Sequence, residues 1–387
     1  MRPALPAGMS PVRRRALLGG GVALGLAGCG SPGPAAAPAA SPSVTGAAPP
    51  PVLPHQAGIV TPPPAAAEFR AYDVAVTARD ELAALLGRIG GVVARPPASV
   101  TVSVGASLFD GRFGLADRRP LRLTAMPGFP GDVLDPGRCH GDLLVQACAA
   151  TPAAARALAD SVARAAGPAV RRRWSATGFR HENGTTADGR PRDRNLFGFS
   201  DGAGNPDPAD AAAMDELVWV GAGSGEPDWA AGGSYQVVRL IRFAVELWNA
   251  DPVERQEEVF GRRRADGAPL GREREIDEPD YAGDPNGQAI RLDAHIRRAN
   301  PRTPETRNQR ILRRGYSYRA GADAAGHADE GLIFVCFQQD LERGFATIQR
   351  RLAGEALERY ILPFGGGYYF ALPGALPGEL GRGLAAG

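Results

Sequence analysis

The stretch HGDLLVQACA (140–149) precedes AAARALADSVARA (153–165), so that an apolar run typical of a β-strand leads into an amphipathic helical pattern. Thr151 and Pro152 lie between them and favour a helix start, because threonine caps helix amides and proline suits the first turn. The run EGLIFVCFQQ (330–339) is followed by a similar helical pattern. The sequence therefore predicts a strand-and-helix unit that occurs twice.

A second pair of segments repeats the same order. EFRAYDVAVTARDELAALLGRI (68–89) and GSYQVVRLIRFAVELWN (233–249) each place a strand pattern before a helix pattern. Two halves with strands and two helices in this order predict an α+β fold of two ferredoxin-like domains with antiparallel sheets, of the dimeric α+β barrel type. We expect the N-terminal half at 55–212 and the C-terminal half at 213–387.

The N-terminus has the features of an export signal. Arginines at 13–15 precede the short apolar stretch ALLGGGVALGLAG (16–28) and resemble a twin-arginine signal, which we place at 1–29. LAGC resembles a lipobox that would lipidate Cys29; the alternative is a soluble protein cut further along. Residues 30–54 form a Pro/Ala-rich linker. We expect an extracytoplasmic protein, on the periplasmic or cell-envelope side.

Composition excludes several classes of function. The net charge of the 387 residues is +2, which argues against a nucleic-acid binder. All 44 basic residues are arginine, and the absence of lysine excludes Walker-type phosphate binding and Schiff-base chemistry. Beyond the signal, Cys139, Cys148 and Cys336 form no C-x-x-C motif, which excludes a disulfide scaffold, a zinc ribbon and covalently attached haem.

The segment GFSDGAGNP (198–206) fits the G-x-S-x-G pattern of a serine nucleophile elbow, with Ser200 as the nucleophile. Its flanks do not fit, because the preceding residues are too charged for a buried strand. Pro206 and Pro208 also prevent the helix that should follow. A serine hydrolase remains an alternative, with a downstream histidine as its base.

Three polar residues could instead form a site for a flat ligand. Asp201 lies in a glycine-rich turn, where its carboxylate could alternatively bond its own backbone. His295 has no second histidine or cysteine at the spacing of a zinc site, and a single imidazole suits haem. Arg313 follows 18 residues later (313 − 295 = 18) and could alternatively be a surface arginine.

Four segments together resemble the dye-decolorising (DyP-type) haem peroxidases, in particular the exported, EfeB-like deferrochelatase/peroxidase branch. They are GFSDGAGNP, HIRRANPRT (295–303), ILRRGYSY (311–318) and GLIFVCFQQDLERGF (331–345). Further blocks extend the resemblance from residue 55 to residue 374, which is nearly the whole chain after the linker.

The resemblance implies a duplicated ferredoxin-like fold with one haem b (iron protoporphyrin IX) per chain, held in the C-terminal half. It makes His295 the iron ligand, and Asp201 and Arg313 the catalytic pair on the opposite face of the haem. It also implies haem contacts from Arg313 and from two short segments: Gly202, Ala203, Gly204, Asn300, Pro301 and Arg302.

The implied reaction reduces hydrogen peroxide and oxidises bulky organic reductants such as dyes through a ferryl intermediate, with Asp201 moving the proton and Arg313 stabilising negative charge. An aspartate base predicts activity at acidic pH. The alternatives are a deferrochelatase, which releases iron from haem and leaves the porphyrin intact, and a non-catalytic haem carrier. Iron-uptake proteins at the membrane and a second copy of the chain are the possible protein partners.

Several supporting roles stay open in the sequence. The second ring nitrogen of His295 needs an acceptor, for which Asp340, Glu342 and Glu358 are candidates. Ile333 and Phe334 could form a wall of the site or pack in the core. Four aromatic residues could relay electrons or simply pack, and His181 resembles a surface residue. The aromatic residues are Trp219, Trp248, Tyr316 and Tyr318.

Overall fold

The computed structural model describes residues 55–92, 98–180, 182–185, 191–323 and 326–385. These residues belong to one compact unit, Pro50–Gly387. The expected export signal (1–29), the expected linker (30–54) and His181 lie outside the described residues. Within the described residues, no helix combines the length and the apolar character needed to cross a membrane.

The first half of the compact unit has the strand order β2-β3-β1-β4, with every pairing antiparallel. Its helices follow the first and third strands, which is the split β-α-β arrangement that the sequence predicts. The side chain of Thr151 accepts a hydrogen bond from the backbone of Ala154 and caps the second helix. The elements are β1(Ala66–Val74), α1(Arg79–Gly90), β2(Ser99–Gly105), β3(Leu143–Ala149), α2(Pro152–Ala166) and β4(Val170–Phe179).

The second half repeats this arrangement with the order β9-β10-β7-β11. Its helices are shorter, and Gly344 has a non-helical backbone inside the wide turn η7(Glu342–Ala346), which directly precedes the helix α7(Thr347–Leu352). Asp340 caps that turn by accepting a hydrogen bond from the backbone of Arg343. The elements are β7(Ser234–Phe243), α4(Val245–Asn249), α5(Val253–Phe260), β8(Leu312–Arg313), β9(Tyr316–Ala322), β10(Ala328–Gln338), α7(Thr347–Leu352) and β11(Ile361–Ala371).

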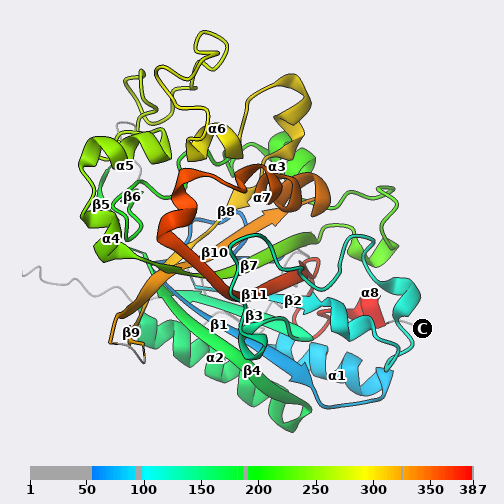
Figure 1. Ribbon diagram of the computed structural model, residues 1–387. Helices are drawn as coiled ribbons and strands as arrows, with labels where there is room; N and C mark the ends of the chain where they lie inside the picture. Colours follow the sequence, from blue (N-terminus) through cyan, green and yellow to red (C-terminus); the bar gives the residue numbers. More distant parts are fainter. Residues whose placement is uncertain (1–54, 93–97, 181, 186–190, 324–325, 386–387) are drawn as a thin grey trace, which may run out of the picture. The chain divides into compact units, whose positions relative to one another are not determined.

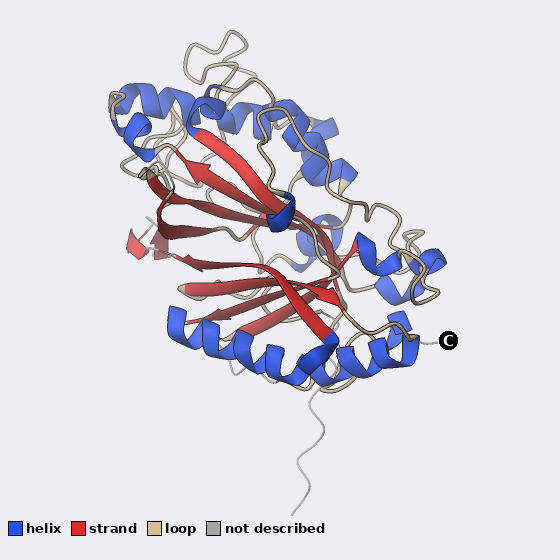
Figure 2. Ribbon diagram, turned by 60° about the horizontal axis from the view of Figure 1, so that its bottom comes forward, coloured by secondary structure: helices blue, strands red, loops and turns tan. Residues whose placement is uncertain are grey.

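Two joints link the half-sheets into a closed ring of eight strands, to which β8 adds a short ninth. At one joint β11 pairs with β2 through three residue pairs, beginning at Tyr369 and Gly105. At the other, β4 pairs with β9 through the single pair Phe179 and Ser317. The closed ring leaves few exposed strand edges. Figure 2 shows helices on both sides of the strands, with α1 and α2 along one side and the helices of the second half along the other.

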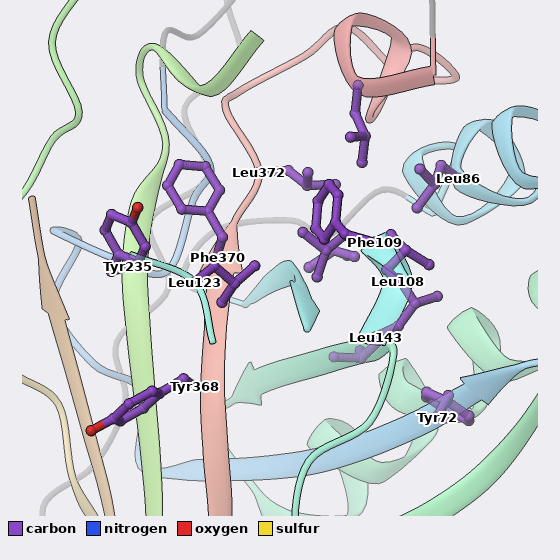
Figure 3. Packing of buried hydrophobic residues seen from close by; sticks show 14 of the residues in the cluster. Tyr72, Leu86, Leu108, Phe109, Leu123, Leu143, Tyr235, Tyr368, Phe370 and Leu372 are labelled. Carbon is purple, nitrogen blue, oxygen red and sulfur yellow. The ribbon is translucent and has the colours of Figure 1, made fainter. Parts of the chain in front are cut away.

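Alternating residues of the strands point to opposite faces of the sheet, where they form the two largest of the four hydrophobic clusters found among the described residues. Phe69, Ile333 and Tyr369 point into the ring, where they are fully buried. Tyr368 and Phe370, the neighbours of Tyr369 in β11, point to the other face. There they pack with Leu108, Leu143 and Tyr235 under the loops that follow β2 (Figure 3).

The remaining elements include α3(Ala211–Leu217), β5(Glu182–Thr185), β6(Pro191–Asp193), α6(His295–Ala299), α8(Arg382–Ala385) and short turns of 3-10 helix at η6(Pro304–Gln309) and η8(Ala356–Tyr360). A long polar insertion lies between the helices of the second half. It runs from α5 to β8 and contains α6 and η6 (Figure 1). This insertion supplies most of the polar side chains of the site described next.

Candidate active site

A cavity of about 240 Å³ lies in the second half of the fold, on the outer face of β7 and β10. The insertion, the segment after β6 and the chain from η7 to η8 form its other walls. Seven of the residues predicted for the site line it: Asp201, Ala203, Gly204, His295, Asn300, Arg302 and Arg313. Among the described residues, Gly202 and Pro301 do not line it, although each is adjacent in sequence to a residue that does.

His295 is the first residue of α6 and faces the cavity. Its Nδ1 lies 2.7 Å from Oε2 of Glu355, whose side chain is 4% exposed. Because an ionised carboxylate can only accept hydrogen bonds, Nδ1 of His295 must carry the hydrogen. In the neutral ring, Nε2 is then left with a free lone pair for a metal. The ring of Phe260 packs edge-on against the imidazole.

Glu355 is not among the acceptors that the sequence suggested for His295. Asp340 is occupied with the backbone of Arg343, and Glu342 forms an ion pair with Arg350. Glu358 accepts a hydrogen bond from the backbone of Gly354. A buried glutamate before a short helical turn has no distinctive sequence pattern, and only the packing of η8 against the insertion places it beside His295.

Asp201 lies in a turn whose glycines, Gly202 and Gly204, have positive φ values of 85° and 79°. Within the described part of the chain its carboxylate makes no hydrogen bond, so the expected alternative of a bond to its own backbone is not observed. Its Oδ2 lies 3.4 Å from the point that a Cβ on Gly315 would occupy. The missing side chain at 315 therefore gives the carboxylate room to meet a ligand.

The charge of Asp201 acts on Arg180. Burial alone would lower the pKa of Arg180, but the charges of Asp201 and Asp193 outweigh burial and raise it. Arg180 forms an ion pair with Asp193 and donates to the carbonyl of Gly315. The carboxylate of Asp201 is therefore near a positive charge without being bound by it.

Arg313 ends the short strand β8 and is held by neutral groups. Its Nε donates to Oδ1 of Asn205 over 3.1 Å, and its Nη2 donates to the carbonyl of Ala203 over 2.6 Å. Sequence reasoning missed Asn205, although it lies in the same GFSDGAGNP segment as Asp201. The turn therefore contributes the acid, Asp201, and also the two groups that hold the guanidinium of Arg313 in place.

Ser200 does not have the geometry of a nucleophile elbow. It forms an isolated β-bridge with Arg194, and turns follow it until α3 begins at Ala211. Its hydroxyl is buried and has no hydrogen-bond partner within the described residues. Around Ser200 the described chain therefore lacks the strand, tight turn and helix that a serine hydrolase needs at its nucleophile.

The cavity carries an excess of positive charge. The carboxylates that line it are those of Asp201 and Glu355, against six arginines. Burial, and then the charge of Arg313, lower the pKa of Arg262 to about 10. Several lining arginines have buried nitrogens without a partner among the described residues, a pattern that fits a ligand with acidic groups. These are Nε of Arg239, Arg262, Arg302, Arg310 and Arg351, and Nη1 of Arg239.

Arg302 has a positive φ of 58°, which is uncommon for a residue other than glycine. Its Nη1 pairs with Glu278 over 2.6 Å, while its Nε remains without a partner. Such backbone strain costs about 1–3 kcal/mol and tends to occur at functional sites.

The apolar wall contains one of the two residues expected there. Leu332 and Phe334 of β10 line the cavity, whereas Ile333 points into the ring and packs in its core. Strand alternation explains the difference. The four aromatic residues considered as relays are buried in the packed cores, as are Cys148 and Cys336: Trp219, Trp248, Tyr316 and Tyr318.

Comparison with known proteins agrees with this geometry. The family model "Dyp-type peroxidase, N-terminal" matches residues 56–180, and the model "Dyp-type peroxidase, C-terminal" matches residues 192–376. Deferrochelatase of Shigella flexneri is 44% identical, over 85% of this chain and 86% of the relative. Deferrochelatase of Yersinia pestis is 43% identical, over 95% and 92%.

Solved structures give the same result. The DyP-type peroxidase of Streptomyces coelicolor superposes with a TM-score of 0.78 at 36% identity, over 87% of this chain and 96% of that one. The DyP-type peroxidase of Cellulomonas bogoriensis has a TM-score of 0.78 at 33% identity, over 87% and 97%. The predicted duplicated fold and the predicted resemblance are confirmed, and the chain belongs to the Dyp-type peroxidase family.

Proposed function

We propose that this protein is a haem-dependent peroxidase that reduces hydrogen peroxide and oxidises bulky organic reductants. Membership of the Dyp-type peroxidase family supports the reaction class. The observation that carries the proposal is the position of His295. Its Nδ1 is engaged by buried Glu355, and it lines the same cavity as an acid, Asp201, and a cation, Arg313.

The cavity fits haem b, one per chain. Apolar side chains such as Phe260, Leu332 and Phe334 suit the faces of a porphyrin, and arginine nitrogens without partners suit its two propionates. His295 supplies the imidazole that an iron needs. Contacts from the two flanking segments would hold the macrocycle: Gly202, Ala203, Gly204, Asn300, Pro301, Arg302 and Arg313.

Bound haem supplies an iron centre that accepts electrons from organic reductants and passes them to hydrogen peroxide. Asp201 takes a proton from one peroxide oxygen and returns it to the other, so that the second oxygen leaves as water. Arg313 remains charged at any working pH and stabilises the negative charge that develops during this transfer.

Absorption spectra and steady-state kinetics of the purified holoenzyme test the proposal. We expect a Soret band that changes on addition of peroxide and is lost in His295→Ala. Asp201→Asn and Arg313→Leu should keep the band but lower peroxide turnover by about 100-fold or more, the usual loss when a proton-transfer group or an electrostatic group is removed. Unchanged turnover in both variants would contradict the peroxidase mechanism.

A second candidate function is release of iron from haem with the porphyrin left intact, because the curated relatives at 43–44% identity are named deferrochelatase. Incubation of the protein with haem and a ferrous-iron chelator would test it. Accumulation of metal-free porphyrin supports deferrochelatase activity, whereas intact haem together with normal peroxide turnover excludes it.

We also propose that the chain is exported by the twin-arginine pathway and that Cys29 is lipidated, on the strength of its N-terminal sequence. Mass spectrometry of the mature N-terminus would test both points, since an acylated Cys29 at the first position is the expected result. The division into halves at residues 212 and 213 remains our proposal; it lies between β4 and β7, within α3.

A further inference from the structure

We propose that Asn205 is a positioning residue, which holds Arg313 away from Asp201 so that the two charges do not neutralise each other. This inference rests on the proposed function of the cavity. It concerns a residue for which the sequence patterns suggested no role, and it follows from the hydrogen bonds of one side chain.

The Asn205 side chain binds both the backbone and the side chain of Arg313. Its Nδ2 donates to the carbonyl of Arg313 over 2.8 Å, and its Oδ1 accepts from the backbone nitrogen of Arg313 over 3.2 Å. Strand β8 lies at the end of the strand order, beside β10. The amide of Asn205 therefore forms the hydrogen bonds to the backbone N–H and C=O of Arg313 that a neighbouring strand would otherwise form.

The same Oδ1 of Asn205 also accepts from Nε of Arg313 over 3.1 Å, and Ala203 accepts from Nη2. Two of the three guanidinium nitrogens are thus fixed by neutral oxygens. No carboxylate of the described chain forms an ion pair with Arg313. The remaining nitrogen, Nη1, has no hydrogen-bond partner in the described chain. It is not one of the fully buried polar atoms, so it is the donor presented to the cavity.

Asp201 lines the same cavity, and its carboxylate has no hydrogen bond within the described residues. The other charged groups around the pair are Arg262, whose pKa is lowered partly by Arg313, and Arg180, which is paired with Asp193. A mobile guanidinium in this cavity would be attracted to the free carboxylate. The neutral clamp of Asn205 prevents this, and leaves Asp201 able to move a proton while Arg313 keeps its charge for the substrate.

The test compares Asn205→Ala with the wild-type holoenzyme, and uses fluoride binding to the ferric protein as a readout independent of turnover. We expect kcat/KM for peroxide to fall about 10- to 100-fold, the range for a misplaced catalytic group, and the Kd for fluoride to rise. A crystal structure of the variant should show the guanidinium within ion-pair distance of Asp201. Asp207→Ala is the matched control, because Asp207 is exposed in the same loop and, within the described residues, its carboxylate accepts a hydrogen bond only from the backbone of Ala209.

A double-mutant cycle decides whether Asn205 acts through Arg313. In an Arg313→Leu background, Asn205→Ala should cause no further loss of kcat/KM. Asn205→Asp keeps an oxygen for Nε but adds a negative charge. It should therefore weaken fluoride binding even when the melting temperature matches that of the wild type.

Each outcome has a defined meaning. Wild-type kcat/KM and fluoride affinity in Asn205→Ala would overturn the inference, and so would a further tenfold loss in the Arg313→Leu background. If Arg313→Leu itself has normal turnover, the proposed peroxidase mechanism fails. A loss in Arg313→Leu with a normal Asn205→Ala overturns only the role of Asn205.

Discussion

Replacement of Glu355 by glutamine should raise the reduction potential of the bound iron. Glu355 accepts a hydrogen bond from Nδ1 of His295 over 2.7 Å, and its side chain is 4% exposed, so water screens its charge poorly. The negative charge makes the imidazole a stronger donor and stabilises the more positive iron. Glutamine is nearly the same size and retains an accepting oxygen, so the change removes the charge and keeps the contact.

The expected size follows from the two kinds of hydrogen bond. Bonds to charged groups contribute about 1.5–3 kcal/mol, and neutral bonds contribute about 0.5–1.5 kcal/mol. The difference of about 1.2 kcal/mol corresponds to about 50 mV, since a tenfold change in a one-electron equilibrium equals about 59 mV. Glu355→Gln should therefore raise the ferric/ferrous potential by about 50 mV.

Spectroelectrochemical titration of the Soret band measures this potential directly. Glu358→Gln is the matched control, because Glu358 lies three residues away and, among the described residues, its carboxylate accepts a hydrogen bond only from the backbone of Gly354. Its potential should equal that of the wild type. An unchanged or lower potential in Glu355→Gln, with haem still bound, would refute the role of Glu355 as the charge behind His295.

Three further changes test the fold around the site. Thr151→Ala removes the side-chain cap of α2, which accepts a 3.2 Å hydrogen bond from the backbone of Ala154. The free energy of unfolding, measured in urea, should fall by about 1 kcal/mol. An equal loss in Thr151→Ser, which keeps the hydroxyl, would show that the cap is not the cause. Phe197→Ala removes a ring that is 1% exposed and stacked 4.0 Å from Phe243, and should cost about 3–5 kcal/mol in the same assay; a loss below about 1 kcal/mol would contradict the packing. Burial raises the pKa of Tyr281 to about 12 from an ordinary value of 10.0, so the stability it contributes below pH 10 is lost between pH 10 and 12. Tyr281→Phe should therefore make the melting temperature fall less steeply over that range, and an unchanged slope would show that Tyr281 titrates normally.

The repeated strand-and-helix pattern was sufficient to predict the fold, because strand alternation and helix caps are local properties of the chain. Thr151 caps α2 as expected. The shorter helices of the second half were not predicted. The non-helical backbone at Gly344, where a Cβ would lie 3.1 Å from Cγ of Gln338, has no distinctive sequence pattern.

The site was predictable to the extent that its residues lie in distinctive segments. Asp201, His295 and Arg313 line one cavity as expected, but their supports were not found. Asn205 lies in the same sequence segment as Asp201, but its role depends on the position of β8 at the edge of the sheet, which the sequence does not show. Glu355 lies 60 residues from His295 (355 − 295 = 60), and no local pattern connects the two.

The joint between β4 and β9 is weakly paired. It consists of one residue pair, and Arg180, next to Phe179, donates a hydrogen bond across the joint to the carbonyl of Gly315. Because Gly315 follows Arg313 by two residues, a small shift of β9 relative to β4 would move the cavity wall without disturbing the packing inside the ring. Backbone amides there should exchange with deuterium faster than those of the strands on either side, and the candidate active site lies beside this joint.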